Sequence, residues 1–372
     1  MKIVAAELRW VQIPLVAPFR TSFGTCYDRD TIVLRVVTDQ GIEGWSECGA
    51  EIDPLYSEEW LAGVELVIRD HLWPRITALG DGLTAVAVKP ALEPVKRHFM
   101  AKHLLETAIL DAELKGAGMS FGSYLGSVKE RVPAGVSVGI MDTLPELLEA
   151  VAGYVEAGYV RIKLKIEPGW DLEPVRLVRQ EFGDDLLLQV DANTAYTLLD
   201  VQHLTRLDEF GLLLIEQPLR EDDLRGHAEL ARVMRTPVCL DESITSARDA
   251  ATAIAQRACS VINIKPARVG GYLEARRIHD VAAANGIPVW CGGMLETGIG
   301  RAPNLALAAL PGFVLPGDTS ASSRYYSQDL TKPFELDADG CIAVPTGPGI
   351  GVDILPDVLA AVTDRVDSLP IG

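Results

Sequence analysis

Positive charge is scarce in this sequence. Its 34 lysine and arginine residues stand against 52 aspartate and glutamate residues, which gives a formal net charge of −18. A surface this acidic repels phosphate backbones and anionic lipids, so neither nucleic acid nor a membrane is expected as a partner. A site for an anionic substrate is still allowed, provided that the site gathers its own cations.

Cysteine pairs of the kind that bind zinc are also missing. The 6 cysteines are scattered, and none belongs to paired Cys-x-x-Cys motifs. Cys239 and Cys291 stand inside apolar runs, where a buried reduced thiol is the expected state. The N-terminus lacks the apolar core of a signal peptide, and no apolar stretch approaches the roughly 18 residues of a membrane span. We therefore expect a cytoplasmic protein.

Motifs for several other kinds of chemistry are absent. The 6 histidines are scattered and fall mostly in expected helices. Neither a Ser/His/Asp pattern nor a phosphate loop has the necessary spacing. The nearest match to a dinucleotide-binding loop, Gly298-Ile299-Gly300, lacks the third glycine and opens no strand–helix unit. The sequence therefore disfavours a doubly wound nucleotide-binding sheet.

The first part of the chain, residues 1–130, has the pattern of an α+β domain. It begins with strand-like segments and continues with apolar residues at helical spacing. Residues 16–25 read as a loop with two aromatic side chains, which either pack as core or close over a substrate as a lid. The strand-like segments are Lys2–Leu15 and Thr31–Asp39, and the helical ones are Ser57–Trp73 and Lys102–Gly116.

Residues 131–320 carry a repeat of about 25 residues, and residues 321–372, which show none, are expected to return to the first domain. Each repeat has a short apolar run, a turn and an amphipathic helix, as in Pro174–Phe182 and Leu273–Asn285. This is the βα unit of a parallel, TIM-like barrel, so we expect an α/β fold. The eight runs are Ala134–Ile140, Arg161–Ile166, Leu186–Asn193, Leu212–Leu219, Val238–Ser243, Val261–Pro266, Pro288–Gly293 and Phe313–Asp318.

Lysines stand near the C-terminal ends of two runs, where barrel enzymes build their active sites. In Arg161–Ile166 the odd positions are cationic and the even positions are aliphatic. Because strand side chains alternate in direction, Lys163 and Lys165 should point into the barrel. Their like charges should lower each other's pKa and favour a neutral amine near pH 7. Lys265 should approach from the opposite side.

Three acids follow the same repeat. Asp191, Glu216 and Asp241 are spaced 25 residues apart, which places them on neighbouring strands at a similar height. Carboxylates gathered in this way repel one another, and oxygen-only ligands select a hard cation such as Mg²⁺ or Mn²⁺. The alternative is a structural network in which each acid pairs with a lysine. The common register of the three acids favours the metal, which would stabilise the enediolate formed when a substrate carboxylate loses its α-proton.

Together these residues resemble the enolase superfamily, in which lysine bases work with Mg²⁺, and within it the muconate-lactonizing subgroup. The resemblance runs end to end. It is strongest to the N-succinylamino acid racemase / o-succinylbenzoate synthase family. The segments that carry it are RIKLKIEPGW (161–170), DANTAY (191–196), KPARVGG (265–271), VWCGG (289–293) and LPGDTS (315–320).

The resemblance implies a (β/α)7β barrel capped by the N-terminal domain, in a dimer or octamer. It implies a divalent cation, Mg²⁺ or alternatively Mn²⁺ or Co²⁺, on the three acids. Lys165 and Lys265 would form the acid/base pair, with Lys163 assisting electrostatically. The segment Gly49–Asp53, in the expected second cap loop, is unlike the familiar pattern and leaves the side-chain preference open. The implied substrate-binding residues are Phe19, Phe23, Asn193, Arg268 and Met294.

Two reactions on a small carboxylate substrate fit such a site. Racemisation of an N-acylamino acid uses both lysines, one on each face of the α-carbon. Formation of o-succinylbenzoate is a syn elimination of water, for which Lys165 alone can act while Lys265 steadies the enediolate. Arg268 favours the racemase. Weaker alternatives are a dipeptide epimerase or cycloisomerase, and a barrel that binds an acidic metabolite without turnover.

Overall fold

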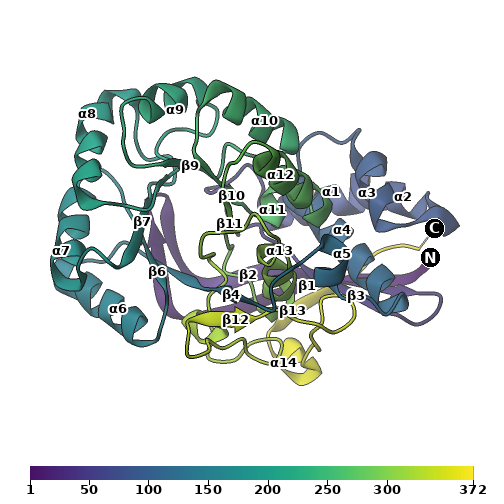
Figure 1. Cartoon of the computed structure of the whole chain (residues 1–372). Coiled ribbons are helices and arrows are strands. Elements are labelled where there is room, and N and C mark those ends of the chain that lie inside the picture. Colours follow the sequence, from purple (N-terminus) through teal and green to yellow (C-terminus); the bar gives the residue numbers. More distant parts are fainter. Residues whose placement is uncertain (372) are drawn as a thin grey trace.

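The computed structural model describes residues 1–371, and it begins with an antiparallel sheet in the order β13-β1-β2-β3. The last strand of the chain therefore pairs with the first. Figure 1 shows the long purple strands crossing beside the barrel, with the N- and C-terminal ends near each other. The strands are β1 (Ile3–Thr21), β2 (Gly24–Thr38), β3 (Glu43–Glu47) and β13 (Thr363–Ser368).

The helix α4 packs against β3 and fixes the sheet of this first domain. A Cβ at Gly44 would collide with the carbonyl oxygen of Ala108 on the helix, so the close approach requires glycine. The predicted helices are present, although the first is interrupted by a π-helical turn, η1. The helices are α1 (Leu61–Val67), η1 (Ile68–Leu72), α2 (Trp73–Thr77), η2 (Gly80–Gly82), α3 (Ala85–Leu92), α4 (Phe99–Gly116) and α5 (Phe121–Leu125).

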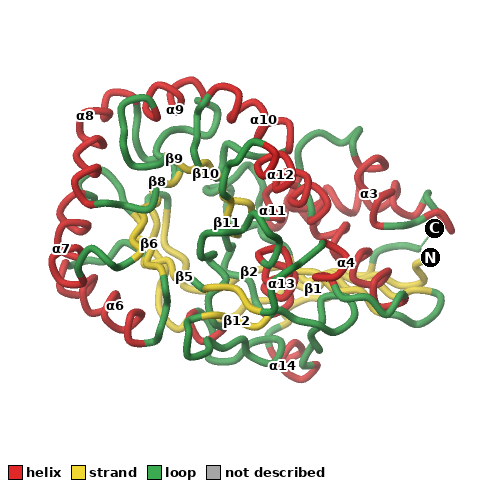
Figure 2. The backbone as a smooth tube through the Cα atoms, viewed as in Figure 1, coloured by secondary structure: helices red, strands yellow, loops and turns green. Residues whose placement is uncertain are grey.

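Seven parallel strands form the barrel in the order β11-β10-β9-β8-β7-β6-β5, as the repeat predicts. Figure 2 shows helices in red around the outer side of these yellow strands. The strands are β5 (Gly135–Val138), β6 (Arg161–Lys165), β7 (Leu187–Asp191), β8 (Ile215–Glu216), β9 (Val238–Leu240), β10 (Val261–Ile264) and β11 (Val289–Cys291). The helices are α6 (Leu144–Glu156), α7 (Leu172–Phe182), η3 (Leu198–Asp200), α8 (Val201–Leu204), η4 (Thr205–Phe210), α9 (Leu224–Ala231), α10 (Ala247–Gln256), α11 (Pro266–Val269), α12 (Tyr272–Ala284) and α13 (Gly298–Ala308).

The eighth run, Phe313–Asp318, closes the ring without forming a strand of its own. Phe313 bridges to Val289 of the last strand, and Gly317 bridges to Ala134 beside the first. Pro316 interrupts this run, and a proline has no N–H to donate to a neighbouring strand. Isolated bridges therefore take the place of a continuous ladder.

Residues 16–25 are not a loop, and this detail of the sequence-based prediction is wrong. They form the tip of the β1–β2 hairpin, where Arg20 pairs with Thr25 and Thr21 with Gly24. The register shifts between Pro14 and Phe19, so the tip is offset from the rest of the ladder. Cross-strand pairing therefore keeps most of this segment extended, although its own sequence suggested a loop.

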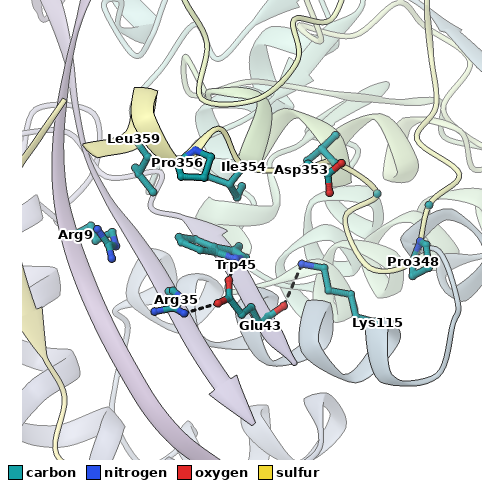
Figure 3. Close-up of a pocket in the computed structure, with 13 residues that line it drawn as sticks. Arg9, Arg35, Glu43, Trp45, Lys115, Pro348, Asp353, Ile354, Pro356 and Leu359 are labelled. Atoms are coloured by element: carbon teal, nitrogen blue, oxygen red, sulfur yellow. Dashed lines mark hydrogen bonds and ion pairs between the residues drawn. The ribbon is translucent and has the colours of Figure 1, made fainter. Parts of the chain in front are cut away.

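The C-terminal segment runs back to the first domain. It contains η5 (Ser322–Arg324), β12 (Cys341–Ala343), which pairs with β4 (Arg131–Pro133), and α14 (Pro356–Ala361). A cavity of about 830 Å³ lies where this segment meets β3 and α4. Figure 3 shows that its cations are already engaged, with Arg35 on the Glu43 carboxylate and Lys115 on the Glu43 carbonyl oxygen. Size alone therefore does not make it the functional site.

Candidate functional site

Lys163 and Lys165 project from β6 into the barrel interior, as the alternation along this strand predicts. The strand pairs in parallel with β7, and Lys165 stands opposite Asp191. Both lysines are buried, with 2% and 8% of their surface exposed. Ile162 and Leu164, at the intervening positions, belong to the hydrophobic core.

The ammonium group of Lys163 lies among three carboxylates. Its Nζ is 2.6 Å from Asp318, 3.0 Å from Glu216 and 3.3 Å from Asp191. Burial lowers the pKa of Lys163, but the three negative charges raise it by more, so the net shift is upward. The predicted net lowering of the pKa of Lys163 is therefore wrong, because the three acids outweigh burial and the opposing charge of Lys265.

Lys165 contacts the first acid of the row and an asparagine. Its Nζ is 2.6 Å from Asp191 Oδ2 and donates to Asn193 Oδ1 at 2.7 Å. Asn193 has a φ of 42°, in the left-handed region that asparagine tolerates better than most residues. The side-chain nitrogen Nδ2 of Asn193 donates to Glu242 Oε1 at 3.0 Å. The strained turn after β7 thus fixes a hydrogen-bonded chain beside Lys165.

Lys265 follows β10 directly and precedes a proline. Its backbone is extended because Pro266, which begins the short helix α11, disfavours a helical residue before it. Its Nζ is 2.9 Å from Asp241 Oδ2 and donates to the hydroxyl of Tyr56 at 3.0 Å. Burial lowers the pKa of Lys265, and the charges of Tyr56, Glu216 and other acids shift it upward overall.

The two lysines stand at opposite ends of the row of acids. In the sheet, β7, β8 and β9 separate the strands that carry them. Asp191 ends β7, Glu216 ends β8 and Asp241 follows β9. Lys165 contacts the first of these acids and Lys265 the last. This is the arrangement that abstraction from two faces of one carbon requires.

Arg268 lies one helical turn after Lys265 and is turned towards protein acceptors. Its guanidinium contacts Asp241 Oδ1, and it donates to the carbonyl oxygens of Ile244 at 3.0 Å and Asn263 at 2.8 Å. Asp241 is therefore held by a cation on each oxygen. Arg268 also lines a cavity of about 330 Å³, together with Phe23 and Asn193.

The three acids have the chemistry of a divalent-cation site. They are 1%, 0% and 0% exposed for Asp191, Glu216 and Asp241, and all donate oxygen, as Mg²⁺ prefers. Within residues 1–371, no three His, Cys, Asp or Glu side chains are gathered closely enough to hold a metal. Lysine ammonium groups lie against the acids. Burial and the charge of Asp191 raise the pKa of Glu216, so the donor set fits a cation that offsets this repulsion.

The predicted cap residues lie around the same mouth. Phe19 is 7% exposed, and its ring centroid is 6.0 Å from Lys165 Nζ. Phe23 packs against Tyr56 with ring centroids 6.1 Å apart. The hydroxyl of Ser22 donates to the carbonyl oxygen of Ala192 at 3.3 Å, which ties the hairpin tip to the barrel. Met294 is buried in the core at 6% exposed.

Two residues that the sequence reasoning passed over belong to this cluster. The hydroxyl of Tyr56 donates to Asp241 Oδ2 at 3.1 Å while accepting from Lys265. Asp318 bonds Lys163 at 2.6 Å and Arg161 at 2.8 Å. The position of Asp318 at the end of the eighth run was a usable signal. No signal in the sequence pointed to Tyr56, because it belongs to the first domain and reaches the site only when the two domains pack together.

Comparison with known families matches both domains of the chain. The mandelate racemase / muconate lactonizing enzyme N-terminal domain matches residues 4–126, and the enolase C-terminal domain-like family matches residues 146–358. A crystal structure of an enolase superfamily member from Listeria innocua superposes with a TM-score of 0.95 at 39% identity, covering 100% of both chains. No helix in residues 1–371 has the length and apolar character needed to cross a membrane.

Curated relatives extend over nearly the whole chain. An N-succinylamino acid racemase of Amycolatopsis is 63% identical over 98% of both sequences. An o-succinylbenzoate synthase of Geobacillus kaustophilus is 46% identical over 93% of this chain and 92% of its own. With both domains matched, the fold shared and the strand-end acids and lysines in place, this chain belongs to the enolase superfamily, in its mandelate racemase / muconate lactonizing enzyme group.

Proposed function

We propose that this enzyme abstracts the α-proton of a carboxylate substrate and racemises N-succinylamino acids. The observation that carries the proposal is the placement of Lys165 and Lys265 at opposite ends of the row of acids. An amine on each side of the α-carbon allows one to remove the proton while the other returns a proton to the opposite face. The Amycolatopsis racemase, at 63% identity, supports this reaction.

We assign the divalent cation, Mg²⁺ or alternatively Mn²⁺ or Co²⁺, to Asp191, Glu216 and Asp241. When bound, the cation supplies positive charge to the substrate carboxylate and so stabilises the enediolate. Lys165 and Lys265 hold or accept the α-proton, and Lys163 adds positive charge near the developing anion. Compensation of the negative charge on the acids would also lower the pKa of Lys163 and Lys265 towards the neutral range.

The remaining predicted residues position substrate in this proposal. Phe19 and Phe23 on the hairpin tip exclude water from the mouth of the barrel. Met294 contributes an apolar surface to the bottom of the substrate pocket. Asn193 orients Lys165 through its 2.7 Å hydrogen bond. Arg268 lines the cavity beside Phe23 and binds substrate there, and it also holds Asp241, which it contacts directly.

Exchange of the α-proton tests the function. N-succinyl-L-methionine incubated with enzyme and Mg²⁺ in D₂O should lose both its α-proton signal and its optical rotation. Lys265→Ala should reduce racemisation at least about a hundredfold, the usual contribution of a general acid or base, while Lys165 still exchanges the proton of one enantiomer. The control Lys96→Ala, an exposed lysine, should racemise normally. Absence of exchange by the wild-type enzyme would reduce the proposal to binding alone.

A second reaction, o-succinylbenzoate synthesis, is favoured by the relative of that name at 46% identity. A syn elimination needs one lysine to act as base and then acid, and Lys165 is suited to both steps. We therefore propose that the same site catalyses it. A dipeptide epimerase is less well supported, since the relative named L-Ala-D/L-Glu epimerase is 26% identical. Parallel assays with both substrates would rank the two main activities.

We further propose a division into a cap of residues 1–130, a barrel of residues 131–320 and a returning segment of residues 321–372. The pairing of β13 with β1 supports the last assignment. We also propose a dimer or octamer, which sedimentation would test. The six free cysteines support a reducing, cytoplasmic location, where thiols stay unpaired.

A further inference from the structure

The second cap segment, residues 49–56, is held against the barrel at both ends. Gly49 packs so closely on Ala267, just beyond Lys265, that a Cβ at this glycine would collide with the alanine side chain. At the other end, Tyr56 accepts the hydrogen bond from Lys265. The residues between these contacts are thereby kept at the rim of the catalytic site.

Glu51 lies between the two contacts. It is partly buried, and no side chain within residues 1–371 bonds or pairs with it. Burial raises the pKa of Glu51, while the positive charges of Arg29, Lys265 and Lys165 oppose that rise. The charges of both site lysines thus act on the Glu51 carboxylate, although neither lysine bonds to it.

Arg29, the cation whose charge lowers the pKa of Glu51 most, is already engaged elsewhere. Its Nη1 donates to the carbonyl oxygen of Ala50 at 3.2 Å, and Nη2 donates to that of Cys48. Its Nε lies 3.6 Å from Glu47. The guanidinium thus stabilises the start of the cap segment and leaves the Glu51 carboxylate to another cation.

A cavity of about 240 Å³ adjoins Glu51 and has two kinds of wall. Its lining includes the acids Asp28, Asp30 and Asp53, the apolar side chains Phe23, Leu55 and Leu295, and Arg29, whose guanidinium is engaged as described above. An apolar stem with a positive end matches both walls, as the lysine and arginine side chains do. Leu295 follows Met294, and Phe23 packs on Tyr56, so the cavity borders the mouth of the barrel.

We propose that Glu51 makes the enzyme prefer N-acylamino acids whose side chain ends in a cation, as in lysine or arginine. The inference rests on the proposed racemase function and specifies its substrate class. The α-carbon would lie between the two catalytic lysines, and the side chain would extend under the cap segment to Glu51. Glu51 is a specificity residue here, because its carboxylate acts on the side chain and not on the reacting carbon.

A pair of substrates of the same shape tests this preference. Nα-succinyl-L-lysine and N-succinyl-L-2-aminoheptanoate differ only in a terminal ammonium or methyl group. The wild-type enzyme should show a kcat/KM at least about tenfold higher for the cationic substrate, the size expected of one partly desolvated ion pair. Glu51→Gln should bring the ratio close to one, mainly by raising KM for the lysine derivative. The control Glu130→Gln, an exposed acid, should keep the wild-type ratio.

The possible outcomes distinguish a failure of this inference from a failure of the proposed racemase function. Equal kcat/KM for the two substrates in the wild-type enzyme, or an unchanged ratio in Glu51→Gln, would refute the role of Glu51 and leave the racemase standing. If neither substrate nor N-succinyl-L-methionine exchanges its α-proton, the racemase proposal fails and the inference fails with it.

Discussion

At the scale of single residues, the site depends on buried ions that stabilise one another. Asp318 lies between Arg161 and Lys163, and the charges of both basic residues hold its pKa below the usual value against the effect of burial. Asp241 receives Lys265 on one oxygen and Arg268 on the other. Removing one partner from such a group leaves an uncompensated buried charge, which costs about 3–5 kcal/mol. This explains why so many charges can be buried together.

Tyr56 gives a prediction at this scale. Tyr56→Phe keeps the ring against Phe23 but removes the hydroxyl that bridges Lys265 and Asp241. Lys265 would then be less well oriented, so kcat for racemisation should fall by about tenfold, equivalent to one net hydrogen bond of roughly 1.4 kcal/mol. Tyr124→Phe, at a partly exposed tyrosine of α5, is the matched control. An unaltered kcat in Tyr56→Phe would show that the hydroxyl has no positioning role.

At the scale of secondary-structure elements, side chains of the cap also stabilise the ends of its own helices. Glu59 accepts hydrogen bonds from the backbone nitrogens of Met100 at 2.8 Å and Ala101 at 3.1 Å, at the start of α4. It is 5% exposed. This carboxylate therefore satisfies N–H groups that have no partner within the helix.

Burial raises the pKa of Glu59 from 4.5 to about 7. Between these values the folded state binds more protons than the unfolded state, so the free energy of unfolding should fall as the pH rises from 4.5 to 7. Glu59→Gln should flatten this dependence by up to about 3 kcal/mol. Urea unfolding at several pH values measures it, with the exposed neighbour Glu58→Gln as control. The same slope in Glu59→Gln and wild type would contradict the assignment.

At the scale of the whole molecule, a protein of net charge −18 keeps several of its cations inside the barrel. Lys163, Lys165, Lys265 and Arg268 are all buried there. The acids outside repel anions, whereas the interior can accept a carboxylate once a divalent cation is bound. Stability and substrate binding should therefore both depend on that cation.

Removal of the metal tests this coupling without an activity assay. Mg²⁺ at about a hundred times its dissociation constant should add about 2.7 kcal/mol to the free energy of unfolding and raise the unfolding temperature by several degrees. Calorimetry with Mg²⁺ and with EDTA measures the difference. Asp241→Asn should abolish the shift, and Asp364→Asn, exposed on β13, should retain it. A shift that survives in Asp241→Asn would place the cation elsewhere.

The sequence alone determined the features that depend on periodicity. The alternation in residues 161–166 put Lys163 and Lys165 on the inner face, and the equal spacing of Asp191, Glu216 and Asp241 put them on successive strands. Both rules are local, because they follow from the geometry of a strand and from the length of one repeat. They were sufficient to predict the barrel and the row of acids.

Only the tertiary structure decided which groups meet across domains. Tyr56 reaches Lys265, 209 residues away in the chain, and Glu51 borders the same mouth. Long-range charges also reversed the expected pKa shift of Lys163, because Glu216 comes from another strand and Asp318 from the run that closes the ring. No local pattern specifies such contacts, since they arise when the cap packs on the barrel and buries charges in a medium of low dielectric constant.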